Sequence, residues 1–326
     1  MNRYRLFHIT EFQYDGAVSE SYNEVRLRPM QDELQSCLSF RLTTNPASSP
    51  SSYLDFFGNW VHQFNILRDH RELKVEAECV VLVHAPKQPH ADGMPLQQLT
   101  AMRDQLADEF YDLLAPSVFI PHTRELSALA ELAERESNGT VGGFVEAAVK
   151  LIHTRFKYEK GATHVNSSIQ DSLESRSGVC QDFAHLLIGL ARVRGLPARY
   201  VSGYLVPKKT AAADASVEEV IGGQASHAWT EVYVPAVGWV GQDPTLGRAT
   251  GLHHIRVAYG RDYGDVPPVR GVYKGHAGQR LSVDVRVRPA LDNEGHEYLQ
   301  ETAAGPVEAP AEEEPPQQQQ QEQQQQ

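Results

Sequence analysis

The pattern of apolar and polar positions divides the chain into a β-rich part and a part that begins with helices. Up to about residue 90, apolar residues alternate with polar ones in short runs that are typical of strands. The predicted strands cover residues 4–14, 22–28, 37–44, 60–67 and 73–84, with turn-forming sequences between them. Because no helical pattern separates them, residues 1–90 are predicted to form an N-terminal antiparallel β-sandwich.

From about Pro95 the apolar residues recur at the spacing of helices. They predict helices over 96–114, 122–135, 141–158 and 167–176, and one more from Cys180 to just before Gly195. Strands are predicted over 198–206, 226–234, 238–242 and 254–259, with a polar loop over 207–223, and the run 281–287 is expected to close their sheet. An α+β core of helices packed on an antiparallel sheet is therefore predicted over 141–290, after a helical connecting region over 91–140.

Composition and charge narrow the classes of function. The chain has 326 residues and no run of 18 apolar ones, so neither a membrane span nor, at its N-terminus, a signal peptide is expected. A formal net charge of −12 without clustered basic residues argues against a nucleic-acid partner. Only Cys37, Cys79 and Cys180 are available for disulfides, which favours a cytoplasmic location. Residues 291–326, rich in Pro, Glu and Gln, are expected to be a disordered tail.

Three segments carry the residue types of nucleophilic catalysis. Cys180 stands at the start of a predicted helix, where free backbone N–H groups and the helix dipole favour a thiolate. His227 begins one predicted strand and Asp243 follows the end of the next, with a tight turn between the two strands. Hairpin pairing can bring these two residues together. His227 can then accept the thiol proton, and Asp243 can fix the tautomer of the imidazole.

These segments resemble the core sequence blocks of bacterial transglutaminase-like proteins. The blocks Gly-Val-Cys-Gln-Asp-Phe-Ala-His, Arg-Tyr-Val-Ser-Gly-Tyr, Ser-His-Ala-Trp-Thr-Glu-Val-Tyr and Gly-Trp-Val-Gly-Gln-Asp-Pro-Thr occur in that order. The β-rich N-terminal part is similar to the sandwich region that precedes this core in the family. The resemblance implies a papain-like core with a Cys–His–Asp triad, carried here onto Cys180, His227 and Asp243. We expect no cofactor and no metal ion.

Several neighbouring residues have more than one interpretation. Trp229 shares the strand face of His227 and either lines the acyl pocket or belongs to the core. Tyr204 and Gln181 are further candidates for substrate binding or the pocket wall. Asp182 and His185, on the cysteine helix, are expected to have local structural roles. The pair His253-His254 has no acidic pair nearby in the sequence, so no metal site is expected there.

The function predicted from these residues is cysteine-dependent acyl transfer on a carboxamide or peptide bond, through a thioester intermediate. The expected partner is a protein or peptide that carries glutamine or another amide group, with no nucleic acid and no membrane. Two alternatives remain open. One is a cysteine peptidase or amidase that uses water as the acceptor, and the other is a non-catalytic binding module that keeps the fold. The sequence does not determine the oligomeric state.

Overall fold

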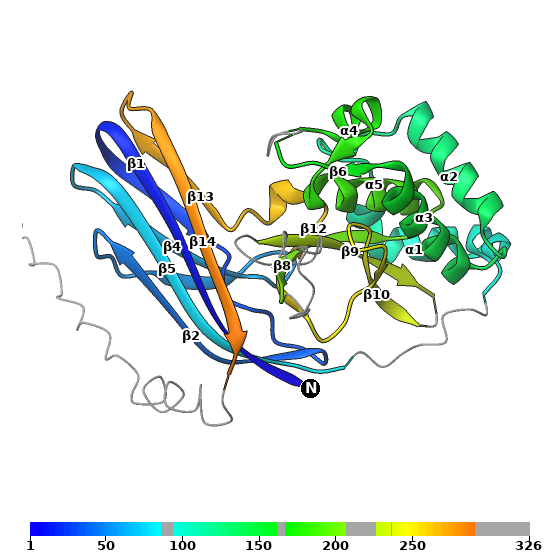
Figure 1. Ribbon diagram of the computed structural model, residues 1–326, viewed down its shortest axis with the longest axis horizontal. Helices are drawn as coiled ribbons and strands as arrows, with labels where there is room; N and C mark the ends of the chain where they lie inside the picture. The colour runs from blue at the N-terminus through cyan, green and yellow to red at the C-terminus, as the bar shows by residue number, and fades with distance from the viewer. Residues whose placement is uncertain (86–93, 162–166, 207–225, 236, 291–326) are drawn as a thin grey trace, which may run out of the picture.

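A curled β-sheet from the N-terminal part lies beside a helical domain that has its own sheet (Figure 1). The computed structural model describes residues 1–85, 94–161, 167–206, 226–235 and 237–290. The predicted loop over 207–223 and the predicted tail over 291–326 lie outside these residues. None of the helices within the described ranges is both long enough and apolar enough to cross a bilayer.

One long strand organises the N-terminal sheet. The first half of β1 (Asn2–Val25) pairs with β5 (His70–Val83) and β14 (Gln279–Pro289), and its second half pairs with β4 (Trp60–Ile66) and β13 (Val269–Lys274). Strands β2 (Gln35–Asn45) and β3 (Ser51–Leu54) complete the seven-stranded antiparallel sheet in the order β2-β5-β1-β4-β3. The two halves of the sheet bury an apolar cluster that includes Tyr14, Val25, Phe64 and Leu73. The predicted antiparallel β-structure of this region is confirmed, as a single curled sheet.

Two predictions about strands in this region are wrong. The predicted strands over 4–14 and 22–28 are one strand that ends at Val25, because β1 continues past the expected turn with a register irregularity against β5 between Gln13 and Val18. The run 281–287 does not close the sheet of the helical domain. It lies in β14, where Leu281 pairs with Phe12 and Val285 pairs with His8. The last two strands within the described residues, β13 and β14, therefore complete the N-terminal sheet.

The second domain follows the predicted order of helices and strands. Its helices are α1 (Leu99–Leu114), α2 (Arg124–Glu136), α3 (Val141–Arg155), α4 (Ile169–Ser175) and α5 (Cys180–Val193). Its main sheet is antiparallel in the order β11-β10-β9-β8-β12, with β8 (Ala198–Leu205), β9 (His227–Val234), β10 (Gly238–Asp243), β11 (Arg248–Ala249) and β12 (His254–Gly260). Helix α5 is the central helix, since nearly all of its side chains are buried between the sheet and helices α2 and α3. Its apolar residues recur at helical spacing, which accounts for the accurate prediction.

Residues of the N-terminal part cover the edge of the second sheet that strand β12 forms. The side-chain amide of Gln35 donates to the carbonyl oxygen of Arg256 (2.6 Å) and accepts from its N–H group (2.9 Å). Asn59 makes the same pair of hydrogen bonds with Tyr259, at 2.8 and 2.9 Å. Two side-chain amides thus satisfy backbone groups of the edge strand β12 that a further strand would otherwise bind.

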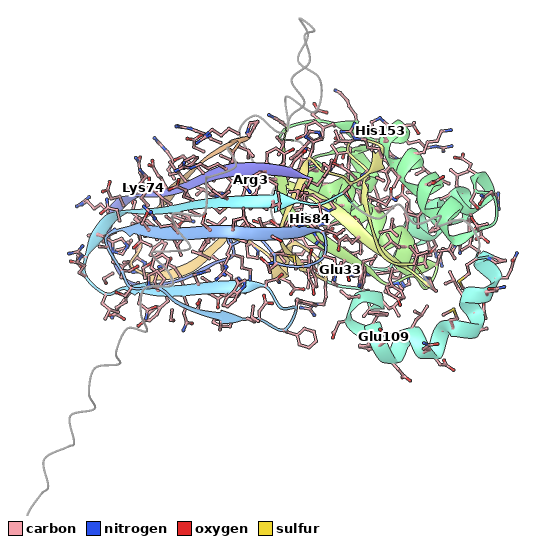
Figure 2. The ribbon with its side chains drawn as sticks, turned by 90° about the horizontal axis from the view of Figure 1, so that it is seen from below. Arg3, Glu33, Lys74, His84, Glu109 and His153 are labelled. Atoms are coloured by element: carbon pink, nitrogen blue, oxygen red, sulfur yellow. The ribbon has the colours of Figure 1, made fainter. Side chains whose placement is uncertain are left out.

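Both domains also share one hydrophobic core. Tyr4, Leu6 and Val81 from the N-terminal sheet belong to the same buried cluster as Tyr204 and Ile255 from the second sheet. Seen from below, Lys74 lies at the far end of the N-terminal sheet, whereas Glu33 and His84 lie where it meets the second domain (Figure 2). The N-terminal sheet is therefore an integral support of the second domain.

Two buried histidines, His8 and His185, are held in the neutral form. Burial lowers the pKa of His8 to about 4 and that of His185 to about 3. His8 lies at the domain interface, where Nδ1 is 2.7 Å from the hydroxyl of Tyr204. Nε2 of His185 accepts the backbone N–H of Tyr263 (3.1 Å), which agrees with the structural role expected for His185.

Candidate active site

Cys180 is the first residue of α5, and local hydrogen bonding fixes this helix start. The Asp182 carboxylate accepts the backbone N–H of Val179 at 2.8 Å, in the manner of a residue that caps its own helix. The chain must pass close to Asp182 here, because a Cβ atom at Gly178 would lie 2.8 Å from its side chain. Asp182 therefore has the local structural role that was expected, and the half-buried Cys180 is held at the positive end of the helix.

The β9–β10 hairpin brings His227 and Asp243 together. His227 is the first residue of β9 and Asp243 is the last residue of β10, and the pairing of Thr230 with Gln242 sets the register between them. Nε2 of His227 lies 2.7 Å from Oδ2 of Asp243, and both side chains are fully buried. This is the contact that the hairpin argument predicts.

The second ring nitrogen of His227 is available for proton transfer. Nδ1 is buried and has no hydrogen-bond partner among the described residues. Burial alone would lower the pKa of His227, but the charge and hydrogen bond of Asp243, together with the neighbouring Cys180 thiol, raise it to about 10. The thiol is thus a close neighbour of the imidazole without a well-formed hydrogen bond to Nδ1, as is common in sites that hold no substrate.

Asp243 is surrounded by four hydrogen-bond donors. Its Oδ1 accepts the backbone N–H groups of Thr245 (3.0 Å) and Leu246 (3.1 Å), and its Oδ2 faces Nε2 of both His227 and His254. Burial would raise the pKa of Asp243, but the two histidines hold it well below its usual range. The carboxylate of Asp243 therefore caps the turn that follows β10 and binds His227 at the same time.

His254 is the residue of this cluster that sequence reasoning missed. Its Nε2 lies 3.1 Å from Oδ2 of Asp243, and its Nδ1 accepts the N–H group of Gly251 at 3.1 Å. No acidic pair lies near His253 and His254 along the chain, but in space the single carboxylate of Asp243 faces His254. Ligand atoms of His227, Asp243 and His254 lie within 4.8 Å of one another, a spacing that could also hold a metal ion. Hydrogen bonds already engage all three atoms, so a proton-linked network accounts for the cluster.

The other candidate residues lie behind or beside this network. Trp229 is fully buried, with its ring centroid 6.0 Å from that of His227 and 5.1 Å, edge-on, from that of His254. It therefore packs beneath the two imidazoles. Tyr204 is directed toward the N-terminal sheet, where its hydroxyl meets His8. Gln181 is the buried second residue of α5.

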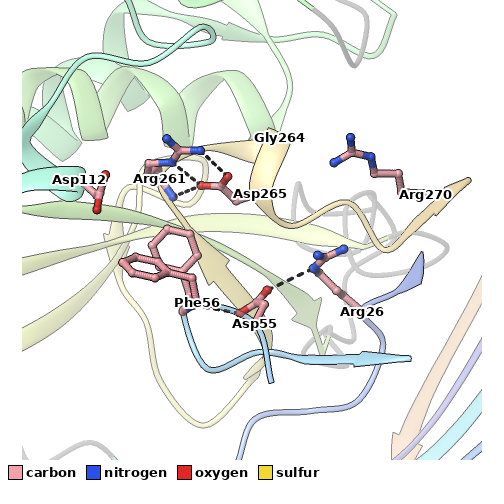
Figure 3. Close-up of a pocket in the computed structure, with 9 residues that line it drawn as sticks. Arg26, Asp55, Phe56, Asp112, Arg261, Gly264, Asp265 and Arg270 are labelled. Carbon is pink, nitrogen blue, oxygen red and sulfur yellow. Dashed lines mark hydrogen bonds and ion pairs between the residues drawn. The ribbon is translucent and has the colours of Figure 1, made fainter. Parts of the chain in front are cut away.

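A surface cavity of about 420 Å³ lies away from this network, between the N-terminal sheet and the second domain (Figure 3). Its charged side chains are largely paired with one another. Arg261 is bound to Asp265 at 2.9 Å, and Arg26 to Asp55 at 3.4 Å. None of its lining residues belongs to the histidine–aspartate network, so we assign no chemistry to this cavity.

Comparison with known proteins identifies the family. Residues 4–82 match the bacterial transglutaminase-like N-terminal region, and residues 128–244 match the transglutaminase-like superfamily. An uncharacterized protein of Mycobacterium leprae is 34% identical over 287 residues, which cover 88% of this chain and 99% of that protein. An uncharacterized protein of Mycobacterium tuberculosis is 35% identical over 303 residues and is covered to 93%. The chain belongs to the bacterial transglutaminase-like family.

Two further comparisons concern better-described proteins. A protein-glutamine gamma-glutamyltransferase of Pseudomonas aeruginosa is 27% identical over 127 residues, which are 38% of this chain and 18% of that protein. A solved structure of a cysteine-protease candidate from Cytophaga hutchinsonii superposes with a TM-score of 0.67 at 20% identity, covering 90% of this chain and 92% of that one. This likeness shows that the whole two-domain fold is shared.

Proposed function

We propose that this protein is a cysteine-dependent enzyme that transfers acyl groups from carboxamide or peptide bonds through a thioester. The observation that carries the proposal is the buried His227–Asp243 pair beside a cysteine at a helix start. An ionised carboxylate on Nε2 leaves Nδ1 of the imidazole as the proton acceptor for Cys180. This division of roles is that of a nucleophile, a general base and an orienting acid.

The proposed reaction proceeds in two halves. Nδ1 of His227 takes the proton of the Cys180 thiol, and the sulfur attacks the carbonyl carbon of the amide. The backbone N–H of Cys180, at the helix start, is suited to stabilise the resulting oxyanion. The imidazolium then returns its proton to the leaving nitrogen as the C–N bond breaks, which releases ammonia or an amine and leaves a thioester. In the second half, an amine or water attacks the thioester with His227 again acting as base.

The proposed substrate is a protein or peptide that presents a glutamine or another amide group. The name of the Pseudomonas relative supports an amine as the acceptor, although the match covers only 38% of this chain. The alternative is hydrolysis, in which water takes the place of the amine in the second half-reaction. We propose a reducing, cytoplasmic setting, because Cys37, Cys79 and Cys180 are all unpaired thiols.

A panel of glutamine-containing peptides, incubated with and without a primary amine, tests the proposal. Mass spectrometry distinguishes amine addition from deamidation and from peptide cleavage. We expect one of these products with the wild-type protein and none with Cys180→Ala. The variant Cys37→Ala, which removes a half-buried cysteine of β2, is the matched control and should keep full activity. No product, combined with a Cys180 that alkylates no faster than a free thiol, would indicate a binding module.

A further inference from the structure

His254 reaches the Asp243 carboxylate from the far side of the sheet. In the strand order β11-β10-β9-β8-β12, the strand that begins with His254 is one edge, and Asp243 belongs to a strand near the other. Residues 250–253 join β11 to β12 and so cross the end of the sheet. His254 thereby binds, at 3.1 Å, the same oxygen atom that His227 binds at 2.7 Å.

The hydrogen bonds of His254 define its tautomer. The N–H group of Gly251 can only donate, so Nδ1 of His254 is the unprotonated, accepting nitrogen. Nε2 therefore carries the proton, and its N–H group donates a hydrogen bond to Asp243. Burial keeps the pKa of His254 low, although the Asp243 carboxylate acts in the opposite direction. His254 is thus a neutral and permanent donor to the carboxylate.

We propose that His254 is a positioning residue that shares the negative charge of Asp243 and so moderates the basicity of His227. The proposal rests on the function proposed above, because it assigns His227 as the base. Two donors on one carboxylate oxygen compete for its charge, so each binds less strongly than it would alone. Without the second donor, Asp243 would hold the protonated form of His227 more tightly. An imidazolium held too tightly returns its proton to a leaving group less readily.

The charged surroundings of the cluster come from few elements. Asp243 on β10 binds His254, and the ring centroid of His227 on β9 lies 6.3 Å from that of His254. The charge of Arg248 on β11 acts at longer range and lowers the pKa of His254. On the other side, Trp229 on β9 packs edge-on against the His254 ring and carries no charge. The Cys180 thiol on α5 adjoins His227. His227 and Asp243 are thus the groups whose ionisation His254 can influence directly.

The N-terminal sheet holds the strand that carries His254. Next to it, Nδ1 of His253 lies 3.3 Å from the hydroxyl of Tyr4, and Gln35 binds both backbone groups of Arg256 two residues further on. These contacts fix the start of β12 against β1 and β2. Through these contacts the N-terminal sheet can influence the position of His254 without contacting substrate.

The pH dependence of Cys180 alkylation by iodoacetamide tests the proposal without any amide substrate. In His254→Leu we expect the alkaline limb of the profile, which reports loss of the His227 proton, to move upward by about one pH unit. His254→Gln, whose amide N–H can replace the donor, should restore the wild-type limb. His276→Leu, the same change at an exposed histidine in the turn between β13 and β14, is the control and should leave the profile unchanged. A limb that stays in place or moves downward in His254→Leu overturns the proposal.

A measurement on the wild-type protein covers the case in which His254→Leu does not fold. Nitrogen-15 NMR of labelled histidines reports which ring nitrogen carries the proton. Among the signals of neutral imidazoles, we expect one that is protonated at Nε2 only, stays unchanged from mildly acidic to mildly alkaline pH, and is absent in His254→Gln, which assigns it to His254. A doubly protonated His254 in this range would overturn the proposal. Failure of the peptide assay alone would overturn the proposed function and leave the alkylation result standing.

Discussion

Replacing Asp243 with asparagine tests the hydrogen bonding of the site with a minimal change. Asp243 accepts from four donors, two backbone N–H groups at Oδ1 and two histidines at Oδ2. An asparagine amide has one accepting oxygen, so its NH₂ group must face two of these donors. The N–H groups of Thr245 and Leu246 cannot become acceptors, whereas His227, whose Nδ1 has no hydrogen-bond partner among the described residues, can change tautomer. His254 keeps its tautomer, because the N–H of Gly251 occupies its Nδ1, and it loses its acceptor. We therefore expect the oxygen to stay with the backbone and the NH₂ group to face His227 and His254.

The expected loss follows from the changed imidazole. With an NH₂ group on Nε2, His227 carries its proton on Nδ1, the nitrogen that should accept the thiol proton. His227 also loses the negative charge that raises its pKa to about 10. A fall to the ordinary value of about 6.5 corresponds to roughly 5 kcal/mol of lost imidazolium stabilisation, or a factor of about 10³–10⁴. The same change in a serine-protease triad costs about 10⁴ in kcat.

Alkylation of Cys180 by iodoacetamide, followed as a second-order rate constant over a wide pH range, measures this loss. We expect the wild-type protein to alkylate faster at acidic pH than a free thiol, because the raised pKa of His227 keeps an imidazolium beside Cys180. In Asp243→Asn this difference should disappear, and the profile should approach that of a free thiol. Asp262→Asn is a matched control, because Asp262 is also buried but uses its carboxylate to accept the N–H of Gly264 at 2.8 Å. If a folded Asp243→Asn protein alkylates at acidic pH as fast as the wild type, the tautomer argument is wrong.

Three further predictions concern stability. Gln35→Leu leaves the buried backbone N–H of Arg256 in β12 without its partner, whereas the carbonyl oxygen of Arg256 keeps the N–H of Met30 at 3.1 Å. The free energy of unfolding in urea should fall by about 1–3 kcal/mol. The exposed Gln97→Leu should change it by less than about 0.5 kcal/mol, and equal losses would contradict the role of the amide. Because the pKa values of His8 and His185 are lowered on folding, their contribution to the free energy of unfolding is complete above about pH 6.5 and declines as the pH falls toward their folded pKa values. The decline is about 2 kcal/mol each at pH 5, and the raised pKa of His227 offsets about 1 kcal/mol of the total. Urea midpoints that do not fall between pH 7 and pH 5 would refute the burial argument. Deletion of residues 1–90 removes β1, the pairing partner of β13 and β14, and five buried side chains of the shared core, those of Tyr4, Leu6, Cys79, Val81 and Val83. The fragment should therefore be insoluble, and a soluble fragment with a cooperative thermal transition would show that the second domain folds alone.

Local periodicity was sufficient for most of the second domain. Helices α2, α3 and α5 have apolar residues at helical spacing and clear polar or glycine ends, so their predicted limits are close to the observed ones. The N-terminal sheet was harder to predict. The expected turn near Gly16 is absorbed into β1 because both halves of that long strand have pairing partners, two of them from the other end of the chain. Alternation indicates a strand but does not identify its neighbours.

The same limit explains why His227 and Asp243 could be paired from the sequence and His254 could not. The first two belong to one hairpin, for which a tight turn determines the neighbour and the direction. His254 requires the order of the whole sheet. Because β12 runs antiparallel to β8, with His254 opposite Leu205, and β8 runs antiparallel to β9, with Gly203 opposite His227, strand direction alone places the start of β12 at the end of the sheet that carries the candidate active site. Once β12 is known to be a neighbour of β8, a polar residue at its first position becomes a candidate for that site, and the hydrogen bond to Asp243 identifies the residue as His254.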